Sequence, residues 1–567
     1  MTPTPDGVER RVTSNDRPPL RVAFLVDSLV QRQWVYRIVE DIARSSIATP
    51  VLVVTNDAPR PRDWPTRVRT AFAKRSRLLR KLYVEADKRL FRAEPDPFAP
   101  RDLRPLLDGC AVLPVRPIQT RYCDYFPDDV LPAILEHRVD VAFRFGFRIL
   151  LGEALNIARY GVWSYHHGDN MAVRGGPAGF WEVMLGHHVT GSILQILTSE
   201  LDAGRVLYRS WASTYKYSLA RSRQNYYWKS ASFAMRKLKD LHERGPAALD
   251  TDASASLYRP YTYPLYRTPG NGEMVWLLSK LALRIARRTA RGAFWVGQWG
   301  LGIKIGKGEG LAPSLHDFRL LVPPRDRFWA DPFPVARDGR YFIFVEEFVY
   351  KAGRGRIAVI EVDEKGSRKE PVTVLEASHH LSYPFVFEWQ GTLYMVPETR
   401  AKKTVELYRC VSFPAEWKRE KVLLDGISAV DATLTEIDGR WWMFANVNVE
   451  GASANDELHL FHASSPLGPW TPHRCNPVKS DVRCSRPAGR LFVHEGQLYR
   501  PSQDSSVAYG FAICINKVIR VDPDEFVEEE VSRILPRWRK GIERNHTLNS
   551  AGRLTVVDAY RYRRRFL

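Results

Sequence analysis

Five segments in the C-terminal half of the chain repeat one pattern, and each places a polar residue at the same point of it. Each segment reads as a strand, a turn containing glycine and a second strand. On the first strand the aligned residues are Asp331, Tyr383, Asp431, Arg486 and His546. On the second strand they are Glu346 or Glu347, Glu398, Asn446, Gln503 with Asp504, and Asp558. Carboxylates together with Arg, His and Tyr offer both donors and acceptors, which suits a ligand with many hydroxyl groups.

These residues meet only if the five segments close on one another. The turn glycines are Gly339, Gly391, Gly439, Gly496 and Gly552, and by subtraction they are 52, 48, 57 and 56 residues apart. A four-stranded sheet with its loops needs about 40–50 residues, so each repeat matches one propeller blade. The spacing therefore predicts an all-β five-bladed propeller over residues 325–567.

In a propeller the innermost strands line the central channel, so we predict that these side chains converge on one mouth of it. The cationic Arg486 is expected to offset the carboxylates there, and Trp329 or Tyr383 to stack on a sugar. The candidate site is Asp331, Tyr383, Glu398, Asp431, Arg486 and His546. Two alternatives remain: the polar residues are structural hydrogen-bonding groups, or the propeller is a platform that docks another protein.

The propeller resembles two known groups. The ring of acids on separate blades is similar to the five-bladed arabinanase and invertase-like hydrolases, whose catalytic acids sit on the inner strands of separate blades. The phrases HLSYPFVFE, GTLYMVPE, VDATL, GPWTPH, NPV, SRPAG and QD resemble the N-terminal region of plant glucosamine inositolphosphorylceramide transferase. That region occurs with carbohydrate-active enzymes, which implies a propeller that faces a glycan.

The N-terminal part of the chain predicts an α/β domain over residues 20–245. The apolar runs LRVAFLVDS and TPVLVVTND flank a segment with helical spacing, VQRQWVYRIVEDIARS, as in a βαβ unit. The pattern resumes with GCAVLPV, the helix-like DVLPAILEHR, VDVAFRFG and GVWSYHH, which favours a Rossmann-like parallel sheet. SRQNYYWKSASFAMRKLKDLHER, within 222–245, reads as one amphipathic helix that closes the domain.

One stretch of this domain, from GVWSYHHGDN to LTSELDAGRVLYRS, resembles the formyltransferases that use 10-formyltetrahydrofolate. The family order is a His, an Arg-Gly pair, a Thr-Gly pair and Leu-Asp-x-Gly. The matching residues are His166, Arg174, Gly175, Thr190, Gly191, Leu201, Asp202 and Gly204. The preceding VDVAFRFGFRILLGEAL, with Phe145 and Gly146, is similar to the strand and loop beside the folate site.

This resemblance implies roles for three catalytic residues. Formyl transfer passes through a tetrahedral oxyanion and needs a donor at that oxygen and a base for the amine. His166 would stabilise the formyl oxygen, Asp202 would orient His166, and Gly204 would let the backbone approach the pterin. The family has Asn two positions before the His, whereas this chain has Ser164, which offers one donor instead of two. An altered or lost activity is therefore the alternative, and His167 is a weaker rival of His166.

Charge and composition limit the partners. The 567 residues carry 84 Lys and Arg against 64 Asp and Glu, a net charge of +20, which favours anionic partners such as phosphate or an acidic membrane surface. The six cysteines include no C-x-x-C pair, so neither a disulfide framework nor a metal site is expected. Without an apolar leader or a long apolar run, we expect a cytoplasmic protein, with a peripheral membrane contact as an alternative.

Two segments carry concentrated positive charge. The first is a basic helix over 66–92, which belongs to the insertion at about 58–104. The preceding N-terminal residues, 1–19, are predicted to be a flexible arm. The connector, 246–324, holds a second basic amphipathic helix with Lys280, Arg284, Arg287, Arg288 and Arg291. Either helix could contact lipid phosphate, and the alternative for each is an ordinary solvated or domain-bridging helix.

The sequence therefore predicts an enzyme of glycan or glycolipid assembly. The α/β formyltransferase domain would transfer a formyl or related acyl group from 10-formyltetrahydrofolate to an amino sugar or nucleotide-linked sugar, and the propeller would bind the glycan. One alternative is a glycoside hydrolase or glycosyltransferase in the propeller beside a degenerate formyltransferase domain. Another is a non-catalytic glycan-binding protein. A nucleic acid is not expected as a partner, because a propeller replaces the barrel that the tRNA formyltransferases carry.

Overall fold

A computed structural model describes residues 17–58, 75–92, 94–169, 172–200, 204–249, 265–306, 311 and 313–566. The chain divides into two compact units. One comprises the residues up to 186, 190–210 and 218–277, and the other comprises 187–189, 211–217 and 278–567.

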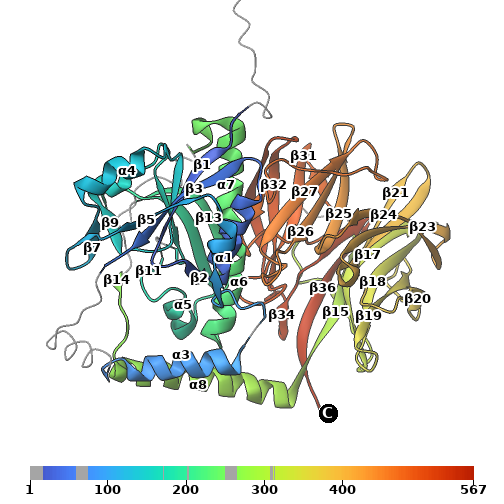
Figure 1. The fold of residues 1–567 in the computed structure, drawn as a ribbon. Coiled ribbons are helices and arrows are strands. Elements are labelled where there is room, and N and C mark those ends of the chain that lie inside the picture. The colour runs from blue at the N-terminus through green and yellow to red at the C-terminus, as the bar shows by residue number, and fades with distance from the viewer. Residues whose placement is uncertain are drawn as a thin grey trace, which may run out of the picture. The chain divides into compact units, whose positions relative to one another are not determined.

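The first unit is built on a seven-stranded sheet (Figure 1, blue to green). Its strand order is β13-β12-β10-β8-β1-β3-β5. The five strands from β10 to β5 are parallel, and β12 runs antiparallel to β10. The strands are β1 (Leu20–Val26), β3 (Ala48–Asn56), β5 (Ala111–Val115), β8 (Val141–Arg144), β10 (Val162–His166), β12 (Val189–Ile196) and β13 (Arg205–Ser213).

The predicted α/β architecture of this unit is confirmed by its central strands and by its first helix. Strand β1 buries six of its seven residues, as expected of a strand covered on both faces. Helix α1 (Gln33–Ala43) buries Trp34, Val35, Ile38, Val39 and Ile42, one apolar face at helical spacing. The other helices are α3 (Leu78–Leu90), α4 (Leu131–Leu135), α5 (Phe180–Leu185), α6 (Leu219–Ala231) and α7 (Phe233–Arg244), and the short strands are β2 (Val30–Arg32), β4 (Pro100–Asp102), β6 (Ile118–Gln119), β7 (Cys123–Tyr125), β9 (Ile149–Leu151), β11 (Arg174–Gly175) and β14 (Leu265–Tyr266).

Two predicted helices differ from the structure. The helix expected over 222–245 is split at Ser232 into α6 and α7. The Ser232 Oγ donates a hydrogen bond to the carbonyl of Lys229 at 2.8 Å, and such back-bonding competes with the helical ladder. Of the basic helix expected over 66–92, the structure has α3, whereas 59–74 lie outside the described residues.

The second unit consists of five antiparallel sheets, which confirms the predicted blade count (Figure 1, yellow to red). Each of the first four sheets is formed by four or five strands in chain order. They are β17 (Arg327–Arg337), β18 (Arg340–Val349), β19 (Arg354–Val362) and β20 (Val372–Leu375); β21 (Ser382–Trp389), β22 (Thr392–Thr399), β23 (Thr404–Ser412) and β24 (Glu416–Asp425); β25 (Ala429–Ile437), β26 (Arg440–Val447), β27 (Glu457–Ala463), β28 (Thr471–Pro472) and β29 (Lys479–Ser480); and β30 (Phe492–His494), β31 (Gln497–Asp504), β32 (Ala512–Val521) and β33 (Phe526–Ile534).

The fifth sheet joins the two ends of the propeller, which the sequence did not predict. Strand β36 (Leu554–Arg564) pairs with β15 (Trp295–Ile305), which in turn pairs with β16 (Arg319–Leu321). Strands β34 (Ile542–Arg544) and β35 (Leu548–Ala551) both pair with the other side of β36. Strands β15 and β36 are in register from Trp295–Arg564 to Ile305–Leu554. The blade strands therefore begin at 295 rather than 325, directly after helix α8 (Asn271–Phe294).

The five predicted turn glycines all have a positive φ, between 57° and 74°. In four of the hairpins the preceding residue is also left-handed: Asp338, Gln390, Asp438 and Glu495, with φ of 50° to 51°. Two consecutive positive φ angles define a type I′ turn, whose twist matches that of the paired strands. Among the described residues, no helix is long and apolar enough to span a membrane.

Candidate functional site

Three inner strands of the propeller share an unusual backbone feature at the predicted polar positions. Asp331, Tyr383 and Asp431 have φ of 49°, 44° and 54°. Each lies where its strand pair shifts register, between Ala330 and Phe333, Ser382 and Phe385, and Val430 and Thr433. A bulge of this kind re-aims a side chain, and a left-handed residue other than glycine costs about 1–3 kcal/mol. The same strain in three blades marks these positions as a candidate site.

Asp331, His546 and Asp558 form the first half of the polar cluster. His546 Nε2 lies 3.2 Å from Asp331 Oδ1, and Nδ1 lies 2.5 Å from Asp558 Oδ2. Asp331 also accepts hydrogen bonds from Thr547 Oγ1 at 2.9 Å and from the backbone N–H of Tyr383 at 3.2 Å. These contacts join the first, second and fifth blades through side chains that are at least nine-tenths buried.

Electrostatics keep this half of the cluster charged. Burial opposes protonation of His546, but Asp558 and Asp331 outweigh it and raise its pKa to about 10. Burial would raise the pKa of Asp331, but His546, Thr547 and Arg486 together bring it below its ordinary value. The imidazolium and the Asp331 carboxylate therefore stabilise each other at neutral pH.

Asp431 and Arg486 form the second half. Arg486 donates to both Asp431 oxygens, Nε to Oδ2 at 2.5 Å and Nη2 to Oδ1 at 3.0 Å, and it donates to Asn455 Oδ1 at 2.9 Å. Gln503 Nε2 donates to Asp431 Oδ2 at 2.9 Å, and Glu398 Oε2 lies 3.6 Å from Arg486 Nη2. Burial opposes the charge of Arg486, but Asp431 raises its pKa well above the ordinary value. The predicted offset of the carboxylates by Arg486 is thus a bidentate ion pair.

Two further carboxyl groups are held in their neutral form. Burial, and then the charge of Asp431, raise the pKa of Glu398 to about 8, although Arg486 opposes this. Burial, and then Asp331 and Glu398, raise the pKa of Glu346 well above its ordinary value. The cluster therefore combines ionised and protonated carboxyl groups within one buried site, as acid–base catalysts do.

The structure brings together five of the six predicted propeller residues, and Tyr383 is the exception. Its ring packs edge-on against Phe333, and its hydroxyl contacts Thr433 Oγ1 at 2.8 Å and accepts from the N–H of Gly489 at 3.0 Å. Trp329 is fully buried and donates its indole N–H to Glu347, so it offers no stacking face. Sequence reasoning missed the aromatic residue beside the cluster, Tyr509, because it lies outside the repeat.

Tyr509 lies over both cations of the cluster. Its ring centroid is 5.2 Å from that of His546 and 4.9 Å from the Arg486 guanidinium carbon. The residue as a whole is 38% exposed, so part of it is open to a ligand. Thr547 and Asn455 were also missed, since a lone hydroxyl or amide in a loop gives no spacing signal.

The cluster is poorly suited to a metal ion. One atom from each of Asp331, His546 and Asp558 lies within 4.8 Å of the other two, which is close enough for shared coordination. However, a metal ligand must be a neutral imidazole, so a metal ion there would have to displace the proton that Asp558 and Asp331 stabilise on His546. These residues fit an internal ion-pair network better than a metal centre.

In the first unit, two of the three predicted catalytic residues are described. His166 ends strand β10, and Ser164 lies on the same strand two residues earlier. Ser164 is buried, and its Oγ accepts a hydrogen bond from Arg144 Nε at 3.1 Å. Asp202, and with it Leu201, lies outside the described residues. The rival His167 stacks on Tyr227 with ring centroids 3.8 Å apart, and burial lowers its pKa well below the ordinary value, as for a structural histidine.

The predicted cofactor glycines are required by packing of the chain itself. A Cβ on Gly146 would lie 2.3 Å from the Asp27 nitrogen, on Gly191 2.8 Å from the Asp169 nitrogen, and on Gly204 2.6 Å from the Ile196 carbonyl. Phe145 joins an aromatic cluster with Trp34 and Tyr165. Thr190 is fully buried. Arg174 and Gly175 form strand β11, which pairs with β14. None of these residues is shown to need a ligand for its position.

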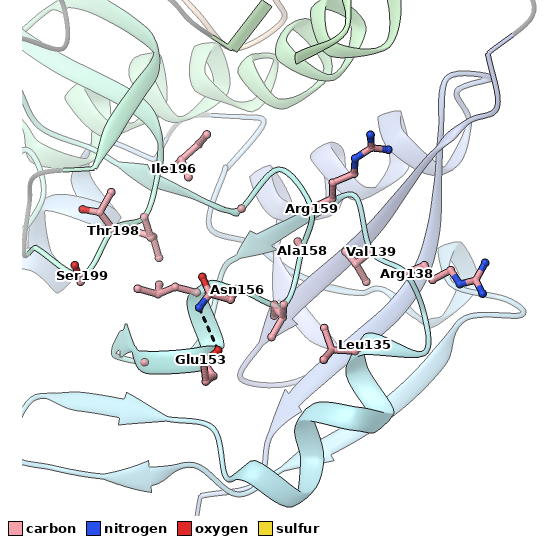
Figure 2. A pocket seen from close by; sticks show the side chains of 15 residues that line it. Leu135, Arg138, Val139, Glu153, Asn156, Ala158, Arg159, Ile196, Thr198 and Ser199 are labelled. Atoms are coloured by element: carbon pink, nitrogen blue, oxygen red, sulfur yellow. Dashed lines mark hydrogen bonds between the residues drawn. The ribbon is translucent and has the colours of Figure 1, made fainter. Parts of the chain in front are cut away.

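A cavity of about 880 Å³ opens elsewhere in this unit (Figure 2). Figure 2 shows Glu153 and Asn156, whose side chains share a hydrogen bond of 3.1 Å, on one wall, and Thr198 and Ser199 on another. The remaining lining residues are Leu135, Arg138, Val139, Gly152, Leu155, Ile157, Ala158, Arg159, Gly161, Ile196 and Leu197. The cavity residues Val139 and Gly161 precede β8 and β10. His166 ends β10, five residues after Gly161, which is roughly 16 Å along the strand at about 3.3 Å per residue.

Comparison with known proteins identifies relatives of the propeller. Residues 323–556 match the family model described as glucosamine inositolphosphorylceramide transferase 1, N-terminal. Over 218 residues, 38% of this chain, the identity is 39% to the glucosamine inositolphosphorylceramide transferase 1 of Oryza sativa subsp. japonica and 37% to that of Arabidopsis thaliana. The match spans only 29% and 28% of those two proteins.

Among solved structures, Zg3597, a family 117 glycoside hydrolase of Zobellia galactanivorans, matches with a TM-score of 0.31 and 12% identity over 47% of this chain and 90% of its own. The predicted resemblance of the propeller to the N-terminal region of the plant transferases is confirmed, whereas no comparison supports the formyltransferase assignment of the first unit. The C-terminal region of this chain is thus similar to the N-terminal region of plant glucosamine inositolphosphorylceramide transferase 1.

Proposed function

We propose that this chain is a transferase of glycan or glycolipid assembly whose propeller holds a sugar at the central polar cluster. The observation that carries the proposal is the meeting of Asp331, Asp431, Arg486 and His546 on separate blades. The proteins that share this propeller sequence are named as transferases of an inositolphosphorylceramide, which supports the glycolipid setting.

The chemistry of the cluster suits a sugar. Hydroxyl groups both donate and accept hydrogen bonds, and the cluster offers carboxylates, amides, a guanidinium and an imidazolium. Tyr509 adds a partly exposed ring at its edge, and aromatic faces pack well against apolar surfaces. The strained backbone at Asp331 and Asp431 holds these carboxylates in place before a ligand arrives.

The test measures binding of a panel of monosaccharides to the full chain. Ligand-observed NMR detects the binding of each sugar. Asp331→Asn and Asp431→Asn should each weaken binding about tenfold, since a charge-assisted hydrogen bond contributes about 1.5–3 kcal/mol. The same blades carry an aspartate at the exposed hairpin turn, so Asp338→Asn and Asp438→Asn are matched controls. A thermal midpoint for each variant separates lost binding from lost folding, and unchanged binding in both site variants would remove the cluster from the proposal.

Hydrolysis of a glycoside in the propeller is a second candidate. The pKa of Asp331 is lowered while that of Glu398 is raised to about 8, and a glycosidase needs one ionised and one protonated carboxyl group. Nitrophenyl glycosides provide the assay. If the protein is a hydrolase, Glu398→Gln should lower turnover by about 10²–10⁴, the range for general acid catalysis. No release of nitrophenol from any glycoside would exclude hydrolysis of these substrates and leave binding untouched.

Formyl transfer by the first unit is a third candidate, which rests on the motifs that resemble the formyltransferases using 10-formyltetrahydrofolate. We expect His166, Ser164 and Asp202 to serve the transfer of a formyl group from that folate to an amino sugar. The cavity of Figure 2 lies at the other end of β10 from His166, so we do not assign the folate to it. Titration with the folate should show binding, and His166→Ala should lower transfer about 10²–10⁴-fold while leaving binding unchanged. No binding of the folate would exclude this activity.

A further inference from the structure

The central sheet of the first unit has its topological switch point between β1 and β8. From β1 the chain continues to β3 and β5 on one side of that strand, whereas β8 and β10 lie on its other side. These strands are parallel, so their carboxyl ends meet at one edge of the sheet. In open α/β sheets, ligands bind in the crevice outside the carboxyl ends at such a point. A ligand site is therefore expected at this edge.

Three polar side chains form a row across the sheet at this edge. Arg144 is the last residue of β8, and it pairs with Leu25 of β1 on one side and with Ser164 of β10 on the other. Ser164 pairs in turn with Gln195 of β12. Residues that are direct partners across strands share one face of the sheet. Arg144, Ser164 and Gln195, the polar row, therefore lie side by side on one face.

The charge of Arg144 has no counter-ion within the chain. Its Nε donates to Ser164 Oγ at 3.1 Å, and its Nη1 donates to the carbonyl oxygen of Arg148, and both acceptors are uncharged. No carboxylate of the described residues forms an ion pair with Arg144, and Asp124 is bound by Arg148 instead, at 2.7 Å. Burial lowers the pKa of Arg144, and the more distant charges of Asp27 and Asp124 only partly offset this. A charge withdrawn from water is normally paired with an opposite charge, so this position favours an anion.

The polar row keeps further donors open. Arg144 Nη2 and Gln195 Nε2 have no hydrogen-bond partner in the described part of the chain, and neither group is fully enclosed. Gln195 Oε1 is enclosed, 3.1 Å from the position that a Cβ on Gly204 would take, so the amide presents its NH₂ group outward. Ser164 accepts from Arg144, which leaves its own hydroxyl hydrogen to donate. Donors beside a positive charge are the complement of an anionic oxygen.

We propose that the first unit binds an oxyanion, the phosphate or carboxylate group of a small molecule, on the polar row at the carboxyl edge of its sheet. A guanidinium group suits both anions, because its planar N–H donors match two of their oxygens at once. The proposal requires neither the sugar site of the propeller nor formyl transfer, so each of the three can fail without the others.

Thermal unfolding of the full chain tests the site with inorganic phosphate and with acetate as probes, at an ionic strength held constant with sodium chloride. An anion that binds only the folded state raises the midpoint in proportion to its occupancy. We expect a saturable rise with at least one of the two anions. A larger rise with phosphate indicates a phosphorylated ligand, and a larger rise with acetate indicates a carboxylated one. No rise beyond that of chloride would overturn the proposal.

Arg144→Lys tests the residue that supplies the charge. Lysine keeps the charge but loses the paired donors, so the substitution should weaken anion binding about tenfold. Arg159→Lys is the matched control, because Arg159 is an exposed arginine beyond the opposite end of β10, and it should leave the response unchanged. Equal responses of wild type and Arg144→Lys would overturn the proposal.

Ser164→Ala tests the polar row without changing its charge. It removes one uncharged donor, so it should weaken anion binding about fivefold. The substitution deletes a single oxygen atom, which makes it the variant to use if Arg144→Lys does not fold. Unchanged binding in Ser164→Ala would overturn the assignment of the anion to this row. Since the probes are inorganic phosphate and acetate, failure of the folate to bind would leave the result intact.

Discussion

At the residue scale, the propeller centre depends on a histidine whose protonated form is stabilised by two buried carboxylates. Asp331 and Asp558 face its two ring nitrogens at 3.2 Å and 2.5 Å, and Trp299 and Tyr509 pack against the ring. Removing one member of a buried ion pair leaves the other uncompensated, which costs about 3–5 kcal/mol. His546 is therefore expected to act on the stability of the fold as much as on binding.

This arrangement predicts a specific dependence of stability on pH. The folded pKa of His546, about 10, lies above the unfolded value near 6.5. The stabilising contribution is therefore fully present below about pH 6.5 and is lost as the pH rises through about 10. His546→Gln should be less stable than wild type at pH 6, and the difference should shrink towards pH 10. Urea unfolding of both proteins across this range is the measurement.

Wild type and His546→Gln share all their other titrating groups. The difference between their unfolding free energies therefore cancels the contribution of those groups. A difference in unfolding free energy that stays constant from pH 6 to pH 10 would show that His546 is not charged in the folded state. Glu398→Gln serves as the contrasting variant. Burial raises the pKa of this carboxyl group, so wild type should lose stability relative to Glu398→Gln as the pH rises from about 4.5 through about 8.

At the element scale, the hairpins are defined by their turn glycines. Gly439 has φ of 74°, and no atom lies within 4 Å of the position that a Cβ would take. Space is therefore available for a side chain there, and only the left-handed backbone opposes one. The same holds for Gly391 and Gly496, with φ of 73° and 74°.

Gly439→Ala should therefore destabilise the propeller by about 1–2 kcal/mol, the cost of a left-handed alanine. Gly292→Ala is the control with the opposite expected sign. Gly292 lies in helix α8 with nothing near its Cβ position, and alanine in a helix is favoured over glycine by about 0.5–1 kcal/mol. Thermal midpoints of the two variants measure both effects, and a neutral Gly439→Ala would mean that the turn relaxes to another type.

Helix α8 presents apolar and basic side chains together in its exposed part. Val275, Leu283 and Phe294 are 59%, 51% and 63% exposed, and Arg287 and Arg291 are exposed beside them. At 100° per residue, Val275, Leu283 and Phe294 fall within one 100° arc, and the two arginines fall next to it. Helices of this kind bind the surface of anionic membranes.

We therefore predict that the chain binds phosphatidylcholine vesicles when phosphatidylserine is present and releases them at high salt. Arg287→Glu should weaken binding roughly tenfold, since each basic residue near an anionic surface contributes about 1 kcal/mol and the substitution reverses a charge. Lys365→Glu, at an exposed propeller turn, is the charge-matched control. Cosedimentation measures the effect, and equal loss in both variants would show a response to net charge alone.

At the scale of the whole molecule, the propeller depends on pairing between distant segments. Strand β15 precedes the first complete blade, and its partner β36 ends the last one, with Gly300 opposite Ala559 near the middle of the pair. Closure of this kind joins the two ends of the propeller within one sheet, so a defect here should spread to all blades.

Leu301→Pro should therefore unfold the propeller as a whole. Leu301 is fully buried and pairs with Asp558, and proline in a central strand removes a ladder hydrogen bond. Val372→Pro is the control, because Val372 is 53% exposed on the short outer strand β20. Near-UV circular dichroism measures the ordered packing of the aromatic side chains in the core. If Leu301→Pro loses only the share of this signal that one blade contributes, the ring does not depend on its closing sheet.

The sequence by itself determined the hairpins of the propeller, the central strands of the first unit and the alignment of the propeller residues. Hairpin glycines and the two-residue period of strands are local properties, so five blades and the equivalence of Asp331, Asp431, Arg486 and His546 could be read directly. Apolar runs likewise predicted β1, β3, β8 and β10 of the first unit.

Only the tertiary structure decided which of these residues act together. The bulges at Asp331, Tyr383 and Asp431 re-aim side chains, so Tyr383 faces Thr433 while its aligned neighbours join the polar cluster. The pairing of β15 with β36 joins residues that are 249 (554 − 305) to 269 (564 − 295) positions apart, which no local pattern encodes. Periodicity fixes the face on which a side chain lies, but closure of the ring buries the charged groups together. Burial and then the neighbouring charges decide which carboxyl groups are ionised.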